Sequence, residues 1–160
     1  DMWNWMPSIN RMIKLPPSMM GQSWMGSDFT NDDLVRMNSI IDDFTHEIVG
    51  SETIDGFDCY IIELIPKPEA AVVWGKIRIW ISKIEFYELK GEYYDEELSL
   101  VNTMTSSEIR KMGDRMLPSK TVMEPVDKPG NQTILETIDI IFDKPIDESF
   151  FSQQNMRRIR

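Results

Sequence analysis

Apolar and polar residues alternate with a period of two along most of this sequence, and turn signals interrupt the alternation. Residues 76–82 are the clearest case, where Ile77, Ile79 and Ile81 alternate with charged residues and a tryptophan. A period of two is that of a β-strand, because successive side chains of a strand point to opposite faces of the sheet. The pattern therefore predicts a mainly β protein whose neighbouring strands run antiparallel and are joined by hairpins.

Turn-forming residues divide the chain into eight or nine expected strands. Asp55-Gly56 is the strongest hairpin signal, because a glycine after an aspartate suits a two-residue turn. The expected strands cover residues 1–6, 11–15, 44–52, 57–65, 76–82, 86–94, 98–110, 115–124 and 132–142. Such a meander curls into a barrel or half-barrel. With no linker, repeat or low-complexity run, residues 1–160 are expected to form a single domain.

The segment Thr30-Asn31-Asp32-Asp33 has the composition of a helix start. Thr30 can cap the helix, and Asp33 stands at the third helical position of a capping box. Apolar residues then follow at helical spacing, so we expect a helix over about 31–41. Residues 69–74 are expected to form one helical turn, and residues 145–156 at most a short helix.

The overall charge argues against a nucleic-acid partner. The 160 residues carry a formal net charge of -10, and such a surface repels a phosphate backbone. A single cysteine cannot form an intrachain disulfide, and no apolar run reaches the ~20 residues of a membrane span. The sequence has no signal peptide, but it begins at Asp1 rather than Met, so we expect that upstream residues have been removed.

The residue types do not assemble a catalytic or metal site. In the predicted hairpin Cys59 pairs with Glu52, and the only histidine, His46, pairs with Ile65. These pairings place His46 and Cys59 on the order of 20 Å apart, too far for a nucleophile and its base. One Cys and one His do not make a zinc site, and Asp28, Asp32 and Asp33 lack calcium-loop spacing. We therefore expect no catalytic residues, metal or cofactor, although a close pair among the 27 acids stays open.

Several expected strands are apolar on both faces, which predicts that something covers each face. Cys59 and Ile61 point one way, whereas Tyr60, Ile62 and Leu64 point the other. A second subunit, upstream residues or an apolar ligand could supply the second cover. Flexible methionine side chains adapt to variable apolar shapes, and the chain has 12 of them. Ordinary core packing and ligand contact both explain the candidate lining residues, which are Trp3, Trp5, Met12, Met19, Met20, Trp24, Met25, Phe29, Met37, Trp80 and Phe86.

The order of several short motifs resembles the outer-membrane lipoprotein-sorting protein family, the LolA-like group. The resemblance rests on residues 1–7 (DMWNWMP), on residues 24–30 (WMGSDFT) followed by Asp33-Leu34, and on residues 115–118 (RMLP) with the tail 151–157. The resemblance covers nearly the whole chain. It implies that the chain corresponds to the C-terminal two-thirds of a family member, without the family's N-terminal helix and first strands. The chain departs from the family pattern at Asn31-Asp32, where an aromatic-acid pair is more usual.

The resemblance implies an open antiparallel half-barrel of the LolA/LolB type, with one or two short helices covering its concave face. It also implies a periplasmic, non-enzymatic carrier of lipid or lipoprotein acyl chains, with an RND-type exporter as a partner. The alternative from the residues themselves is a protein-docking module, or a homodimer, whose apolar sheet face binds a partner. The role of Asp28 stays open between locking its own turn and contacting cargo.

Overall fold

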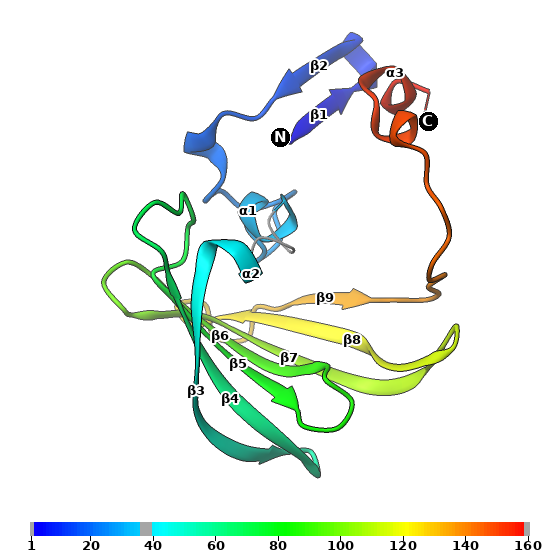
Figure 1. Ribbon diagram of the computed structural model, residues 1–160. Helices are drawn as coiled ribbons and strands as arrows, with labels where there is room; N and C mark the ends of the chain where they lie inside the picture. The colour runs from blue at the N-terminus through cyan, green and yellow to red at the C-terminus, as the bar shows by residue number, and fades with distance from the viewer. Residues whose placement is uncertain (1, 36–39, 159–160) are drawn as a thin grey trace.

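The computed structural model describes residues 2–35 and 40–158 and shows one open, strongly curved antiparallel sheet (Figure 1). Its strands are adjacent in chain order, and β3 and β9 do not pair within the described residues. The sheet consists of β3 (Phe44–Ile54), β4 (Phe57–Pro66), β5 (Lys76–Ser82), β6 (Glu88–Tyr94), β7 (Leu100–Met112), β8 (Arg115–Pro125) and β9 (Thr133–Glu136). This meander confirms the predicted half-barrel class.

Two short helices lie above the concave face of the sheet, as expected (Figure 1). They are α1 (Asn31–Val35) and α2 (Ile40–Asp43). α1 lies within the predicted helix 31–41, and α2 overlaps its end and continues to Asp43. The candidate residue Met37 lies outside the described residues. No helix within 2–35 and 40–158 has the length and apolarity needed to cross a membrane.

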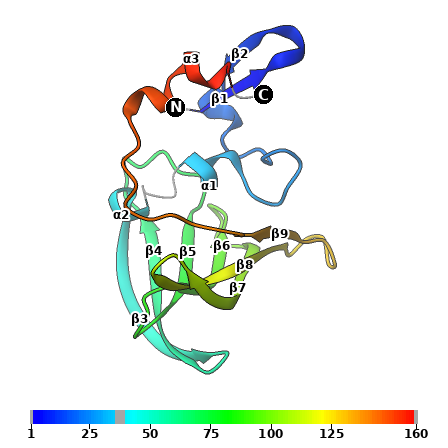
Figure 2. The same ribbon diagram turned by 90° about the vertical axis from the view of Figure 1, so that its right-hand side faces the viewer.

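The N-terminal hairpin and the C-terminal segment lie beside each other above the helices (Figure 1). A separate hairpin of β1 (Trp3–Met6) and β2 (Arg11–Lys14) is followed by the single turn η2 (Pro17–Met19), with η1 (Pro7–Ile9) at its tip. The C-terminal segment runs past the open side of the molecule and ends in η3 (Glu148–Phe151) and α3 (Gln153–Met156) beside that hairpin (Figure 2). There the Arg157 guanidinium lies 5.9 Å from the Trp5 ring centroid.

Three details of the sequence prediction are wrong. Residues 69–74 form turns and irregular chain instead of a helical turn. The last strand ends at Glu136 rather than residue 142, and Arg110 donates hydrogen bonds to the carbonyls of Thr137 and Ile138, satisfying them outside the sheet. His46 pairs with Leu64 instead of Ile65, because a β-bulge at position 49 shifts the register by one residue.

The two-sided apolar character of the strands is confirmed. Leu64 and Ile77 belong to a cluster on the concave face, where Phe44 and Trp74 pack against them. Register places Ile61 opposite Trp80 on the other face, in a second cluster with Cys59 and Leu89. The sheet therefore builds two cores, and the concave one lies directly beneath α1 and α2.

Candidate functional site

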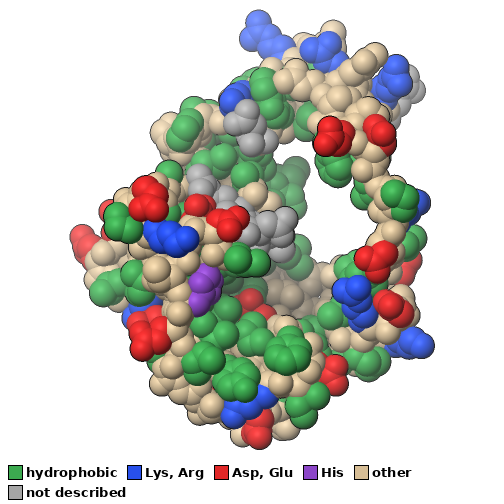
Figure 3. Space-filling model, in the orientation of Figure 1, with side chains coloured by type: hydrophobic (Ala, Val, Ile, Leu, Met, Phe, Trp, Pro, Cys, Tyr) green, Lys and Arg blue, Asp and Glu red, His purple; other side chains and the backbone are tan. Residues whose placement is uncertain are grey.

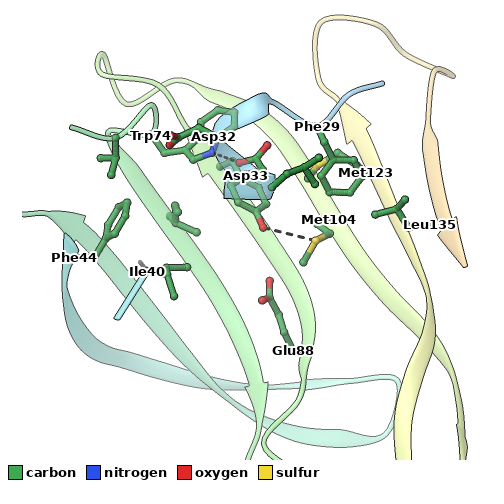
Figure 4. Close-up of a pocket in the computed structure, with 14 residues that line it drawn as sticks. Phe29, Asp32, Asp33, Ile40, Phe44, Trp74, Glu88, Met104, Met123 and Leu135 are labelled. Atoms are coloured by element: carbon green, nitrogen blue, oxygen red, sulfur yellow. Dashed lines mark hydrogen bonds between the residues drawn. The ribbon is translucent and has the colours of Figure 1, made fainter. Parts of the chain in front are cut away.

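An apolar cavity of about 210 Å³ lies between the two helices and the concave face of the sheet. We call it the concave pocket; Figure 4 shows its lining. The space-filling view shows an open gap between the C-terminal segment and the body of the molecule, with apolar side chains at its edge (Figure 3). The pocket is lined by Phe29, Asp32, Asp33, Leu34, Ile40, Phe44, Val72, Trp74, Ile77, Glu88, Tyr93, Met104, Met123 and Leu135.

The Asp33 carboxylate fixes the roof of this pocket. Its Oδ2 accepts a hydrogen bond from the Thr30 backbone N–H at 2.7 Å, and the Asp33 N–H donates to Thr30 Oγ1 at 3.1 Å. This reciprocal pair is the predicted capping box. The second oxygen, Oδ1, accepts from Trp74 Nε1 at 2.7 Å. One carboxylate thus starts α1 and joins it to the loop that precedes β5 (Figure 4).

Asp28 docks the loop before α1 onto the sheet. Its backbone N–H donates to Thr133 Oγ1 at 2.9 Å, and that hydroxyl donates to Asp28 Oδ2 at 2.6 Å. The Asp28 carbonyl also accepts from the buried Asn102 side chain at 3.2 Å. Asp28 therefore connects the loop to β7 and β9, a role different from both alternatives that the sequence left open.

The floor of the pocket combines aromatic and thioether groups. The rings of Trp74 and Tyr93 lie 5.3 Å apart, and the Tyr93 hydroxyl donates to Met104 Sδ at 3.7 Å. Burial holds the pKa of Tyr93 well above its usual value, so the phenol stays neutral. Met104 and the buried Met123 extend this floor across β7 and β8. These polarizable side chains can adjust to an irregular apolar guest.

Glu88 stands in this otherwise apolar floor because of a β-bulge. Trp80 pairs with Lys90 and Ile81 pairs with Glu88, so Leu89 is the additional residue of β6. The bulge turns Glu88 to the face that carries Ile81 and the pocket. Although the residue as a whole is partly exposed, its Oε1 is buried and has no hydrogen-bond partner among the described residues. This burial raises the pKa of the Glu88 carboxyl to about 8.

Gly91 leaves the room that the Glu88 carboxyl occupies. A Cβ at this position would lie 2.8 Å from Glu88 Oε1 and 3.1 Å from Tyr93 Cε2. Both contacts are closer than ordinary van der Waals separation, so a larger residue would push the carboxyl aside. The bulge and Gly91 together place the Glu88 carboxyl in the pocket.

The predicted lining residues are spread over several places. Phe29 lines the concave pocket. Trp3, Met19, Trp24 and Met25 line a separate cavity of about 420 Å³ beside the β1–β2 hairpin, which we call the N-terminal cavity. The other described candidates line neither: Trp5 pairs with Met12 in the hairpin, Met20 is half-buried, Trp80 is buried on the opposite face, and Phe86 is 72% exposed.

Sequence reasoning missed most of the concave pocket. Its floor comes from Ile77, Tyr93, Met104 and Met123, which lie on four neighbouring strands. The pairs Ile77–Tyr93 and Met104–Met123 follow from strand register, so correct hairpin alignment was the signal that could have found them. Glu88 could not be found this way, because the bulge reverses the side that simple alternation assigns to it.

The histidine and cysteine lie apart, and neither lines the concave pocket. His46 is exposed on β3, whereas Cys59 is fully buried in the cluster on the opposite face. Burial raises the pKa of the Cys59 thiol, which disfavours the reactive thiolate. Within the part of the chain that the structure describes, no three His, Cys, Asp or Glu side chains are grouped to hold a metal ion.

The sequence model of a protein family described as "Uncharacterized protein" matches residues 1–158. Comparison with curated protein sequences finds no match. Among solved structures, a DUF1329 family protein from Desulfovibrio piger superposes with a TM-score of 0.86 at 24% identity. This chain covers 63% of that chain, and the superposition covers 96% of this one.

Two further structures carry the fold predicted from the motifs. One is a domain from Vibrio parahaemolyticus that bears the name of an outer membrane lipoprotein-sorting protein, with a TM-score of 0.84, 24% identity, and coverage of 98% of this chain and 65% of that one. The other is a LolA superfamily protein from Nitrosomonas europaea, with a TM-score of 0.76, 24% identity, and coverage of 96% and 66%. The chain thus spans less than two thirds of each, and the LolA-like resemblance is confirmed at the level of the fold.

We predict that Asp33→Ala destabilises the fold more than the removal of an ordinary surface acid does. The variant keeps the Thr30 cap but loses the hydrogen bond from the Thr30 N–H to Asp33 Oδ2, worth about 1 kcal/mol, and leaves the buried Trp74 N–H unpaired, at about 1–3 kcal/mol. Urea unfolding should therefore show a loss of about 2–4 kcal/mol. Asp42→Ala, at an exposed position of α2, serves as the control and should change stability by less than about 0.5 kcal/mol. Equal effects of the two variants would contradict the role assigned to Asp33.

We predict that Glu88 makes the fold less stable as pH rises. Below about pH 4.3 the carboxyl is protonated in both states. Between there and about pH 8 the unfolded chain releases the proton that the folded chain keeps, so stability falls across this window. Glu88→Gln should remove this loss, which is on the order of a few kcal/mol, and gain stability over the wild type as pH rises.

Urea unfolding of the wild type and Glu88→Gln at about pH 5, 6.5 and 8.5 would measure this difference in pH dependence. These pH values lie about one to two pH units apart across the expected titration. Glu97→Gln removes the same charge from an exposed turn and should leave the pH dependence unchanged. Parallel pH profiles for the wild type and Glu88→Gln would show that the Glu88 carboxyl titrates normally.

Proposed function

We propose a function for this chain, which belongs to the protein family described as "Uncharacterized protein" whose sequence model matches residues 1–158. We propose that it is a non-enzymatic carrier that binds acyl chains in the concave pocket. The observation that carries the proposal is the pocket itself: an apolar cavity roofed by α1 and α2 within a sheet of LolA-superfamily fold. Its lining offers aromatic, aliphatic and thioether surface. Such a surface binds through burial of apolar area, so the proposed activity needs no bond to form or break.

The size of the pocket indicates what portion of a ligand it holds. Typical small-molecule pockets enclose about 300–1,000 Å³. At about 210 Å³ the concave pocket suits a segment of one acyl chain, with the remainder leaving through the open side of the sheet. Each buried methylene contributes about 0.8 kcal/mol, before the cost of ordering the chain. Burial of apolar surface is non-directional, so it selects little between acyl chains of different shape, as suits a carrier of varied acyl groups.

The proposed cellular role is the sorting of lipid or lipoprotein through the periplasm to the outer membrane. Its support is the fold shared with the lipoprotein-sorting domain from Vibrio parahaemolyticus. A carrier shields acyl chains from water between two membranes, and an adaptable apolar pocket performs that task. An RND-type exporter as the donor or acceptor of the cargo stays a prediction from the sequence resemblance.

A second candidate function is docking of a protein or of a second copy. The C-terminal segment favours it, because Ile138, Ile141 and Phe151 are each at least 70% exposed. Exposed apolar groups of this kind mark contact surfaces when they adjoin one another. Light scattering across protein concentration, with and without detergent, separates self-association from monomeric lipid binding.

We predict that Leu135→Trp weakens ligand binding, because a larger ring at the rim occupies part of the pocket. The neutral probe 1-N-phenylnaphthylamine reports binding by its fluorescence, and a lipid extract should displace it. Excluding about two methylene equivalents from the pocket corresponds to a loss of about tenfold in affinity.

Ile134→Trp is the matched control for this prediction. Ile134 is the neighbour of Leu135 on β9, is similarly exposed, and does not line the pocket. Its variant should bind the probe within about twofold of the wild type, below the ~1.4 kcal/mol of a tenfold change. Equal affinities for all three proteins, or no lipid on the wild type in native mass spectrometry, would contradict an acyl-binding concave pocket.

A further inference from the structure

The polar groups that face the concave pocket are all acidic or neutral. Asp32 and Asp33 stand at its roof and Glu88 at its floor, and no Lys, Arg or His is among the described residues that line it. Asp33 is engaged with Thr30 and Trp74. Glu88 differs from Asp33, because its buried Oε1 has no partner among the described residues.

The fold places the Glu88 carboxyl in the pocket by two separate devices. The bulge at Leu89 turns the side chain to the concave face, and Gly91 leaves space for its oxygen. In the close-up, Glu88 rises from β6 toward the space below Asp33 and Met104 (Figure 4). A buried carboxyl without a hydrogen-bond partner destabilises a fold, so a ligand that supplies the missing partner gains the full value of that bond.

We propose that the concave pocket takes an amphiphile with a cationic amine, whose ammonium group pairs with Glu88 while its chain packs against Met104 and Met123. The inference rests on the proposed function and names its ligand class. An ammonium donates up to three hydrogen bonds and accepts none, which matches the acceptor oxygens of this site. Where Glu88 is ionised, at pH values above its raised pKa of about 8, a carboxylate ligand such as a fatty-acid anion would bring a like charge beside it, which is unfavourable.

The pairing makes binding depend on pH. Glu88 must release its proton to the solvent before the ion pair forms, so affinity rises as pH approaches the raised pKa of about 8. The other titratable groups that line the pocket are Tyr93 on β6, beside Glu88, and Asp32 and Asp33 on α1. The lining residues of β5, β7, β8 and β9 are uncharged, namely Ile77, Met104, Met123 and Leu135.

Three probes of one chain length separate the headgroup from the tail. Isothermal titration calorimetry of the 160-residue chain would compare octylammonium, octan-1-ol and octanoate at pH 7 and pH 8.5. At pH 8.5 octylammonium should bind at least about tenfold more tightly than octanoate, and more tightly than it binds at pH 7. Glu88→Gln should weaken octylammonium by about tenfold and leave octan-1-ol within about twofold.

Glu97→Gln, which removes the same charge from an exposed turn, controls for general attraction to an acidic protein and should behave as the wild type. At pH 8.5, octanoate binding as tightly as octylammonium would overturn the inference, as would an unchanged octylammonium affinity in Glu88→Gln. In both cases octan-1-ol binding would leave the proposed acyl carrier intact. Failure of all three probes to bind would overturn the inference and the proposed function together.

Discussion

The Asp33 carboxylate holds together the parts of the molecule that make a pocket possible. One oxygen caps α1 through Thr30, and the other binds the Trp74 indole ahead of β5. An open sheet cannot bury its concave face alone, so a roof must be fastened to it. α1 has only five described residues and gains little stability of its own, so tertiary contacts must hold it. Asp28 supplies a second attachment through Thr133 and Asn102. The concave space beneath α1 thus persists because hydrogen bonds at its edges hold the roof.

The two faces of the sheet differ in how completely their apolar side chains are packed, and the concave pocket lies on the less completely packed face. On the opposite face, Cys59 and Trp80 are almost completely buried in a packed apolar cluster. The concave face keeps a cavity whose lining is apolar except for three acids. One of these, Glu88, sits there through a bulge that an ordinary ladder would lack. Apolar walls provide affinity without selectivity, whereas a single buried carboxyl favours one class of headgroup. The apolar walls thus account for the proposed carrier function, and the Glu88 carboxyl accounts for the proposed amine ligand.

Much of the fold could be predicted from the sequence, because hairpin turns and alternation are local signals. The capping box at Thr30 and Asp33 was predicted from four residues and is confirmed in detail. The site was harder, because it depends on which strands lie side by side and on bulges within them. The bulge at position 49 shifts the pairing partner of His46 by one residue, and the bulge at Leu89 turns the Glu88 side chain to the other face of the sheet. Asp28 shows the same limit: its partner Thr133 is 105 residues away, and no local pattern relates the two.

Methionine-methyl NMR tests most directly whether the concave pocket is the ligand site. The methyl groups of Met104 and Met123 report on the floor of this pocket, whereas Met19 and Met25 report on the N-terminal cavity. Met116, which lines neither cavity, serves as an internal reference. Titration with octylammonium should shift the Met104 and Met123 signals in a saturable way and leave the other three unchanged. Shifts confined to Met19 and Met25, or none at all, would contradict the account.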